Sequence, residues 1–189
     1  MGRWEPDARG RLERAALELY GERGFEQTTV AEIAARAGLT ERTFFRHFAD
    51  KREVLFGGSS VMRDLILGAI ARAPASATPI EAIAAGLDAA AGVFTPDRRE
   101  SARRRAGIIA ANAELREREL IKMAAYTAGL VEALRGRGVV EPAASLSAEI
   151  GIAVFRVAFE RWLDQTEERD YGQLLRDSFD ELKALTAAC

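Results

Sequence analysis

Cysteine and histidine are almost absent from this sequence of 189 residues, which contains one of each, Cys189 and His47. A single cysteine excludes an internal disulfide and a thiolate metal cluster. His47 has no cysteine or carboxylate ligands near it in sequence, which disfavours a metal site, and we expect no cofactor. Glycine-rich phosphate loops and HExxH motifs are also missing, so we expect no enzyme.

Long apolar runs are missing as well. The first fifteen residues carry no apolar signal core, and no later stretch reaches the roughly 18 uninterrupted apolar residues that a membrane-spanning helix needs. We therefore expect a cytoplasmic protein with no membrane partner. No segment alternates apolar and polar residues long enough to predict a sheet, and proline is scarce within the periodic segments. The expected fold class is all-α.

An excess of positive charge is absent too, since the formal net charge is −2 at pH 7. Residues 1–56 contain ten Lys or Arg and ten Asp or Glu, which cancel. Within residues 36–52, however, only Glu41 and Asp50 oppose five basic residues: Arg36, Arg42, Arg46, Lys51 and Arg52. Such a local concentration is typical of a surface that contacts a phosphate backbone.

Residues 28–51 have the pattern of a helix-turn-helix. Thr29 and Glu32 have the spacing of a capping box, which starts a helix. The spacing i, i+3, i+4, i+7 then gives that helix one apolar face: Val30, Ile33, Ala34 and Ala37. Gly38 suits the left-handed residue that ends a helix. Thr40 is predicted to cap a second helix over residues 41–48.

The second helix is predicted to face DNA with the side opposite to Phe44 and Phe48, which point inward. In a major groove, Arg42 can form a forked contact with a guanine edge, and Thr43 can meet a thymine methyl or a phosphate. Helix N-terminal amides favour a phosphate near Thr28 and Thr29. The candidate DNA contacts are Thr28, Thr29, Thr40, Arg42, Thr43, Phe45, Arg46, His47 and Lys51. The alternative is that these are solvated surface residues of an ordinary three-helix bundle, which the agreement of caps, turn and core disfavours.

The remaining periodicity predicts a helix before this motif and six after it. The first helix begins at Pro6 or Asp7 and ends at Gly24. A long helix is expected from Lys51 to about Ala71, and the later helices begin near Thr78, Thr95, Glu114, Pro142 and Asp170. We assign residues 1–50 to a DNA-binding domain and residues 51–189 to a bundle of about six helices for ligand binding and dimerisation.

Residues 9–56 resemble the DNA-binding domain of the tetracycline-repressor (TetR) family of regulators. The resemblance rests on the segment GFEQTTVAEIAARAGLTERTFFRHFADKREVL. It implies an operator-binding transcriptional regulator, usually a repressor. In that family a tyrosine whose hydroxyl contacts phosphate usually stands where this chain has Phe45, so that hydrogen bond is absent. By the same resemblance, His47 donates to a phosphate.

The resemblance also implies a homodimer, paired through the last two helices. Large apolar residues there support pairing: Phe155, Trp162, Leu175, Phe179 and Leu182. The alternative is that they form the core of a monomer. Pairing would place two recognition helices about one DNA turn apart, on a palindrome.

The second half loosely resembles a TetR branch that includes regulators responding to acyl-CoA-like ligands. An apolar tunnel with cations at its mouth would suit such an effector, and the candidate pocket residues are Arg105, Ile109, Asn112, Met123, Tyr126, Leu130, Phe155 and Phe159. The alternative is an ordinary core with a solvated basic face. The competing function for the whole chain is a helical adaptor that binds no specific DNA sequence.

Overall fold

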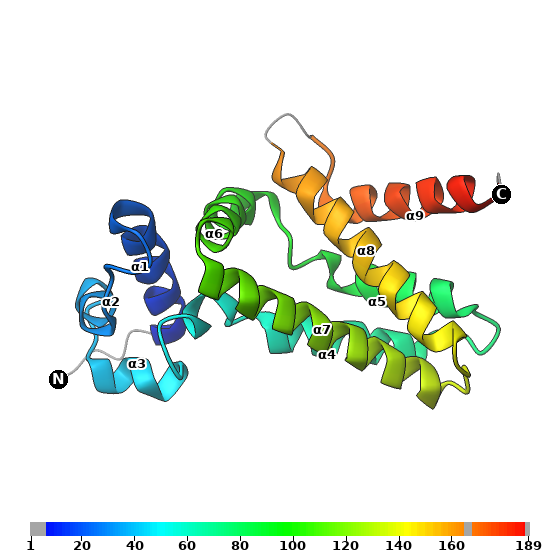
Figure 1. Cartoon of the computed structure of the whole chain (residues 1–189), viewed down its shortest axis with the longest axis horizontal. Helices are drawn as coiled ribbons and strands as arrows, with labels where there is room; N and C mark the ends of the chain where they lie inside the picture. The colour runs from blue at the N-terminus through cyan, green and yellow to red at the C-terminus, as the bar shows by residue number, and fades with distance from the viewer. Residues whose placement is uncertain (1–6, 165–167, 188–189) are drawn as a thin grey trace. The chain divides into compact units, whose positions relative to one another are not determined.

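A computed structural model describes residues 7–164 and 168–187, so Pro6 and Cys189 lie outside the described residues. The described chain is helical and contains no strand, which confirms the all-α fold class. Its α-helices (Figure 1) are α1 Ala8–Arg23, α2 Val30–Arg36, α3 Glu41–His47, α4 Ser59–Arg72, α5 Pro79–Ala91, α6 Arg99–Ala111, α7 Ala113–Gly136, α8 Ala143–Leu163 and α9 Tyr171–Ala187. Two short 3-10 helices are also present, η1 Glu53–Phe56 and η2 Pro96–Arg98.

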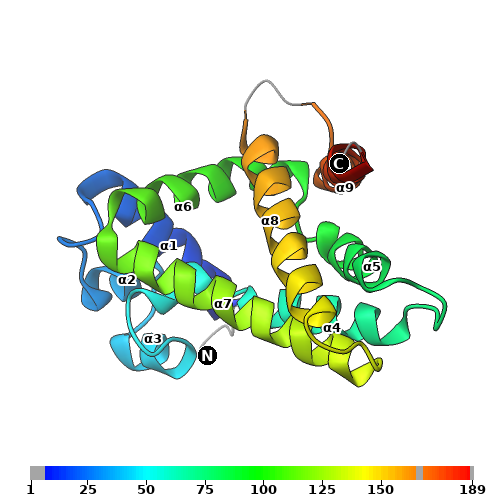
Figure 2. The same ribbon diagram turned by 45° about the vertical axis from the view of Figure 1, so that its right-hand side comes forward.

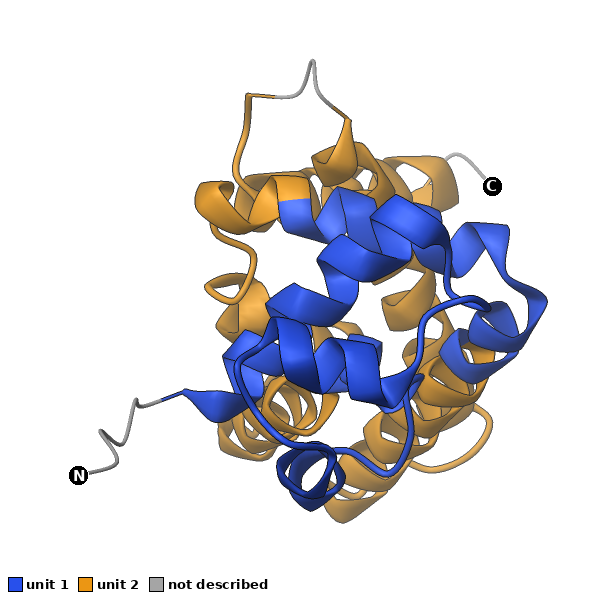
Figure 3. Ribbon diagram, turned by 90° about the vertical axis from the view of Figure 1, so that its left-hand side faces the viewer, with its two compact units in different colours: residues 1–58, 101–119 blue, residues 59–100, 120–189 orange. Residues whose placement is uncertain are grey.

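The chain forms two compact units (Figure 3). Unit 1 comprises residues 1–58 and 101–119, and unit 2 comprises residues 59–100 and 120–189. This division differs from a boundary at residue 50, because most of α6 and the first turns of α7 pack with the N-terminal helices. The assignment of DNA binding to residues 1–50 stays a prediction.

One hydrophobic core holds unit 1 together. Leu12, Ile33 and Phe44, from the three N-terminal helices, are fully buried in it. Ile109 of α6 and Leu115 of α7 belong to the same core. Burying an aliphatic side chain of this size contributes about 1.5–3 kcal/mol. The α6–α7 corner, residues 105–119, is therefore a structural part of unit 1.

The single long helix expected from Lys51 is interrupted, which corrects that prediction. Asp50 does cap the segment, since its Oδ1 accepts from the backbone N–H groups of Arg52 at 2.8 Å and Glu53 at 3.2 Å. The segment then forms η1 and a turn at Gly57 and Gly58 before α4 begins. Arg9 donates to the carbonyl oxygen of Gly57, and a side chain at this position would collide with Glu13 and Arg9. A distant arginine thus takes an acceptor that a continuous helix would use internally.

Close helix packing in unit 2 depends on two glycines. A Cβ at Gly86 of α5 would lie 3.0 Å from the carbonyl oxygen of Ile66 in α4, and a Cβ at Gly151 of α8 would lie 2.5 Å from Ile83 of α5. These glycines let α4 and α8 approach α5, and α9 packs on α5 and α8. On α7, the Tyr126 hydroxyl donates to the Ser59 carbonyl oxygen of α4 at 2.9 Å. The ribbons of α4 and α7 run side by side in both views (Figure 2).

The residues predicted for the dimer interface mostly fill the core of unit 2. Trp162 is fully buried, Leu175 is 1% exposed, Phe179 5% and Phe155 7%, and Leu182 is partly buried. Phe94, Phe155, Phe159, Trp162 and Tyr171 form an aromatic cluster with edge-to-face, tilted and stacked contacts. The interface prediction is therefore wrong for the four buried residues, because the protomer itself already covers these side chains.

One helical stretch in the described residues, Glu53–Arg72, is long and apolar enough by composition to cross a membrane. Core helices can pass the same test. This stretch is interrupted at Gly57 and Gly58, and it buries Ile66 and Ile70 within unit 2. It is weak evidence for a membrane helix.

Candidate nucleic-acid interface

Side-chain caps fix the start of both helices of the motif, as the sequence predicts. The Thr29 hydroxyl accepts from the Glu32 N–H at 3.2 Å, and the Glu32 carboxylate accepts from the Thr29 N–H at 2.9 Å. These hydrogen bonds lower the pKa of Glu32. Thr40 caps α3 by accepting from the Thr43 N–H at 3.2 Å, and Gly38 has a positive φ of 66°. The predicted helix-turn-helix is confirmed.

The recognition helix α3 is held by two buried rings and exposes its opposite face. Phe44 is fully buried and Phe48 is 4% exposed, as predicted. Arg42, Phe45 and Arg46 are exposed, and their spacing of i, i+3, i+4 places them on one face of the helix. No ion pair or hydrogen bond to Arg42 or Arg46 is present within the described part of the chain. Both guanidinium groups are therefore available to an external anion.

His47 ends α3 and is partly buried. Its Nε2 atom is buried and, among the described residues, has no hydrogen-bond partner. The ring lies beside Phe48, with 6.4 Å between centroids. A phosphate contact of His47 stays a prediction, and the burial of Nε2 leaves Nδ1 as the better placed nitrogen.

Thr28 does not face solvent, which corrects its prediction as a surface contact. Its side chain is 1% exposed, and its hydroxyl donates to the carbonyl oxygens of Gly24 at 2.8 Å and Leu19 at 3.4 Å. The hydroxyl thus closes the turn after α1 instead of capping α2. A buried and bonded hydroxyl cannot reach a phosphate without opening this turn.

Lys51 also serves the protein's own backbone. Its ammonium group donates to three carbonyl oxygens of the α1–α2 connection, those of Phe25 at 2.9 Å, Glu26 at 3.2 Å and Thr28 at 3.2 Å. It also lies 4.4 Å from the centroid of the Phe25 ring, within the range of a cation–π interaction. Because an ammonium group has three donors, Lys51 has none left for a phosphate. The predicted phosphate contact is wrong in this structure.

The local excess of positive charge is smaller than the sequence indicates. Arg36 forms a bidentate pair with Glu22, at 2.9 Å for both bonds, and a further pair with Glu18 at 3.3 Å. Arg52 bonds both Asp50, at 2.6 Å, and Glu114, at 2.8 Å. The hydrogen bonds from Arg52 lower the pKa of Asp50. Of the five basic residues in this segment, Arg42 and Arg46 retain exposed, unengaged charges.

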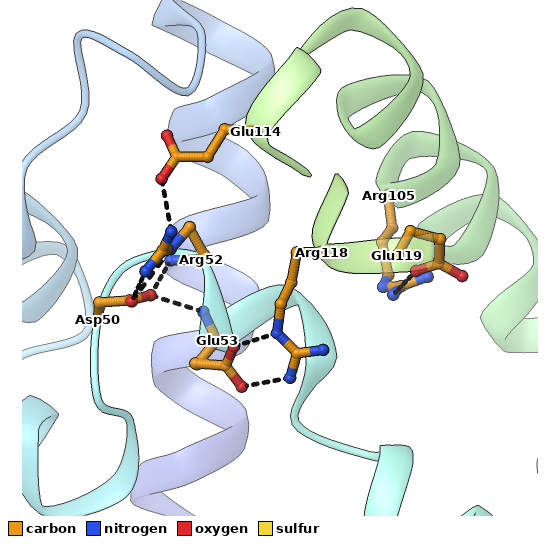
Figure 4. Close-up of polar contacts among 7 residues, drawn as sticks. All are labelled: Asp50, Arg52, Glu53, Arg105, Glu114, Arg118 and Glu119. Atoms are coloured by element: carbon orange, nitrogen blue, oxygen red, sulfur yellow. Dashed lines mark hydrogen bonds and ion pairs between the residues drawn. The ribbon is translucent and has the colours of Figure 1, made fainter. Parts of the chain in front are cut away.

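A second polar cluster joins η1 to the α6–α7 corner, entirely within unit 1 (Figure 4). Arg118 forms two hydrogen bonds with the Glu53 carboxylate, one of them at 2.9 Å, and these bonds raise the pKa of Arg118. Arg105 pairs with Glu119 at 3.3 Å and donates to the Leu55 carbonyl oxygen. The guanidinium groups of Arg105 and Arg118 also lie 5.2 and 4.8 Å from the centroid of Phe56. This cluster ties the segment that follows α3 to the corner.

An apolar cleft lies within unit 2. It has about 280 Å³ of empty space, including the part open to solvent, and its lining residues are Arg63, Ile66, Leu67, Leu87, Tyr126, Leu130, Ile152 and Phe155. Tyr126, Leu130 and Phe155 were expected there from the sequence. Met123 and Phe159 belong to unit 2 but are not among the lining residues.

Three further pocket residues were placed wrongly by the sequence, because they belong to unit 1. Ile109 lies in the core of that unit, and Arg105 bonds Leu55 and Glu119. Asn112 donates to the Ile108 carbonyl oxygen at 2.7 Å, which closes the end of α6. The cationic mouth expected at Arg105 is therefore not part of this cleft.

Family models match both parts of the chain. The model of bacterial regulatory proteins of the tetR family matches residues 13–56, which contain the helix-turn-helix. The model of the MftR C-terminal domain matches residues 77–187, more than half of the chain. The chain belongs to the tetR family of bacterial regulatory proteins.

Relatives and solved structures agree with membership of the tetR family. The HTH-type transcriptional regulator TcmR of Streptomyces glaucescens is 40% identical over 84 residues, which are 44% of this chain and 37% of TcmR. A putative transcriptional regulator from Pseudomonas aeruginosa PAO1 has the same fold, with a TM-score of 0.65 and 21% identity over 98% of this chain and 93% of that one. The structure of SmeT of Stenotrophomonas maltophilia with triclosan has a TM-score of 0.60 and 21% identity, and covers 92% of this chain and 90% of SmeT.

Sequence reasoning missed several residues that shape these sites in this tetR family member. Glu53 and Arg118 are 65 positions apart, and no local pattern connects them. Arg63 and Ile152 line the cleft, and only their helical spacing from other lining residues gives a signal, such as Arg63 with Ile66 and Leu67.

Proposed function

We propose that the protein is a dimeric transcriptional regulator that binds a palindromic operator in the cytoplasm and leaves it when a small apolar effector binds unit 2. The observation that supports DNA binding most directly is α3 itself. This helix is capped at its start, anchored by Phe44 and Phe48, and exposes Arg42 and Arg46 without internal partners. A rigid helix with two available guanidinium groups suits a major groove lined by phosphates.

The effector site we propose is the cleft of unit 2. Seven of its eight lining side chains are aliphatic or aromatic, and the Tyr126 hydroxyl is already bonded to Ser59. This lining favours an apolar ligand, since a polar one would lose hydrogen bonds to water there. The triclosan complex of SmeT provides a precedent for a small molecule bound by a protein of this fold. An acyl-CoA-like effector receives no support from Arg105, whose guanidinium is engaged within unit 1.

For dimerisation we propose an exposed stripe of α8. Leu146 is 60% exposed and Val157 44%, and Ile150 and Ala153 lie between them with helical spacing on the same side. These side chains remain accessible in the protomer, unlike those of Trp162 and Phe179. Replacing Leu146 and Val157 by Asp should yield a monomer in light scattering. A mass equal to that of the wild-type dimer would show that α8 does not form the interface.

Titration of the purified protein into a labelled pool of random duplexes tests DNA binding. Anisotropy should rise on binding, and the affinity should fall steeply as salt increases, because phosphate contacts release counterions. Selection from the same pool should then enrich a palindrome. The competing function, a helical adaptor without sequence-specific binding, predicts no enrichment and no steep salt dependence.

A further inference from the structure

The exposed face of α3 carries an aromatic ring between its two arginines. The Phe45 side chain is 56% exposed, although a large apolar side chain gains free energy when it leaves water. It stands at i+3 from Arg42 and directly precedes Arg46. The face proposed to enter the groove therefore has the order cation, apolar ring, cation.

The Phe45 ring is held in a defined orientation. Its centroid lies 5.4 Å from that of Phe44, with an angle of 81° between the ring planes, which is an edge-to-face contact. Phe44 is fully buried and cannot move without disturbing the core of unit 1. Phe45 is thus a rigid apolar projection, and it lacks a hydroxyl group with which to bond a phosphate.

The chemistry of the major groove limits what such a ring can recognise. Base edges there present hydrogen-bond donors and acceptors, and the thymine C5-methyl is the one apolar group among them. The neighbouring Thr43 competes poorly for this methyl, because it is partly buried and its hydroxyl lies 3.1 Å from that of Thr40.

We infer that Phe45 determines operator specificity by packing against the C5-methyl group of a thymine in each half-site, between the groups contacted by Arg42 and Arg46. This inference rests on the proposed operator binding and adds to it the base type at one position. Recognition of this kind depends on the methyl group and does not require a hydrogen bond to the thymine.

Replacing each thymine of the selected operator in turn by uracil tests the inference, because uracil lacks only the methyl group. At the thymine that faces Phe45 the affinity should fall about fourfold per half-site, the effect of losing one buried methyl-sized group, and about fifteenfold when both half-sites are changed. Placing cytosine at that position should weaken binding, and 5-methylcytosine should restore part of the loss.

Protein variants assign this methyl dependence to one residue. In Phe45→Ala the thymine and uracil operators should bind equally well, and Phe45→Leu should retain part of the difference. Arg46→Ala is the matched control, since it should weaken both operators by the same factor. Thr43→Ser, which removes the threonine methyl, should leave the thymine preference intact. Circular dichroism checks that each variant is folded.

The outcomes separate the two proposals. Absence of binding to any duplex, including the unsubstituted pool, would refute operator binding and the inference together. Specific binding without a uracil-sensitive thymine would refute the inference alone. Uracil sensitivity that persists in Phe45→Ala, or disappears in Thr43→Ser, would assign the methyl recognition to another residue and overturn the role of Phe45.

Discussion

Two basic regions of unit 1 use arginine and lysine in opposite ways. On α3, Arg42 and Arg46 extend into solvent and are available to an external partner. After α3 and at the α6–α7 corner, Lys51, Arg52, Arg105 and Arg118 bind carboxylates and carbonyl oxygens of the unit itself. Residues of the same type thus serve recognition in one place and internal structure in the other.

The difference teaches that positive charge in sequence does not locate a nucleic-acid surface. A guanidinium or ammonium group contributes to DNA affinity only while its donors are free to meet a phosphate or a base. Mutations in the two regions should therefore change different measured quantities. Operator affinity should depend on α3, and the free energy of unfolding should depend on the internally bonded cations.

The largest expected effect concerns Arg42, whose replacement tests the external half of the comparison. Arg42→Ala should reduce discrimination between the selected operator and a scrambled duplex by about tenfold or more, because alanine cannot form the forked hydrogen bonds to a base edge. Thermal unfolding should be almost unchanged. Competition binding measures the discrimination, and an equal decrease in affinity for both duplexes would assign Arg42 to phosphate binding instead of base recognition.

The next effect reverses the two measurements. Lys51→Met should lower the free energy of unfolding by about 1–3 kcal/mol, since three carbonyl oxygens lose a charged donor. It should leave the slope of log affinity against log salt unchanged. Arg46→Met is the matched control, for which we expect unchanged unfolding and a salt slope that is lower by about one for each phosphate that residue 46 no longer binds. If Lys51→Met altered the slope and not the stability, the comparison between the two regions would fail.

How well the sequence predicted each region depends on the separation of the interacting residues. The caps of Thr29 with Glu32 and of Thr40 with Thr43 involve residues three apart, and the motif was predicted correctly because caps, turn and periodicity are local. The pair of Glu53 with Arg118 was not predictable, because an exposed arginine can pair with many carboxylates and tertiary packing selects one of them. Lys51 was misplaced for the same reason, since the carbonyl oxygens it binds come together only when α1 and α2 fold.

Apolar residues of the last two helices illustrate a second limit. Periodicity shows that Trp162 and Phe179 leave water, but it does not show whether the same protomer or a second one covers them. In the structure the aromatic cluster around Phe94 covers them, and Leu146 and Val157 remain exposed. The candidate pocket failed in a similar way, since Ile109 is apolar and buried but belongs to the other unit.

A smaller effect tests the internal half of the comparison at the corner. Arg118→Met should lower the free energy of unfolding by about 1 kcal/mol, because Glu53 loses its bidentate partner while the Phe56 ring keeps an apolar neighbour. The side chains of Arg118 and Glu53 are 27% and 31% exposed, which limits the loss. Chemical denaturation measures it, with Glu117→Gln on the adjacent exposed position as control. Equal stability of the two variants would mean that the pair contributes nothing measurable.

The smallest effect is confined to acid. Hydrogen bonds from Arg52, aided by backbone N–H groups, lower the pKa of Asp50 in the folded state below its usual value near 4. A lowered folded pKa stabilises the protein above the unfolded pKa, and this stabilisation is lost as pH falls through the folded pKa. Asp50→Asn should therefore have a lower melting temperature than wild type at pH 7, and the difference should shrink below about pH 4. A difference that stayed constant from pH 7 to pH 3 would show that the carboxylate charge is not what Arg52 contributes, and that Asp50 acts through its cap alone.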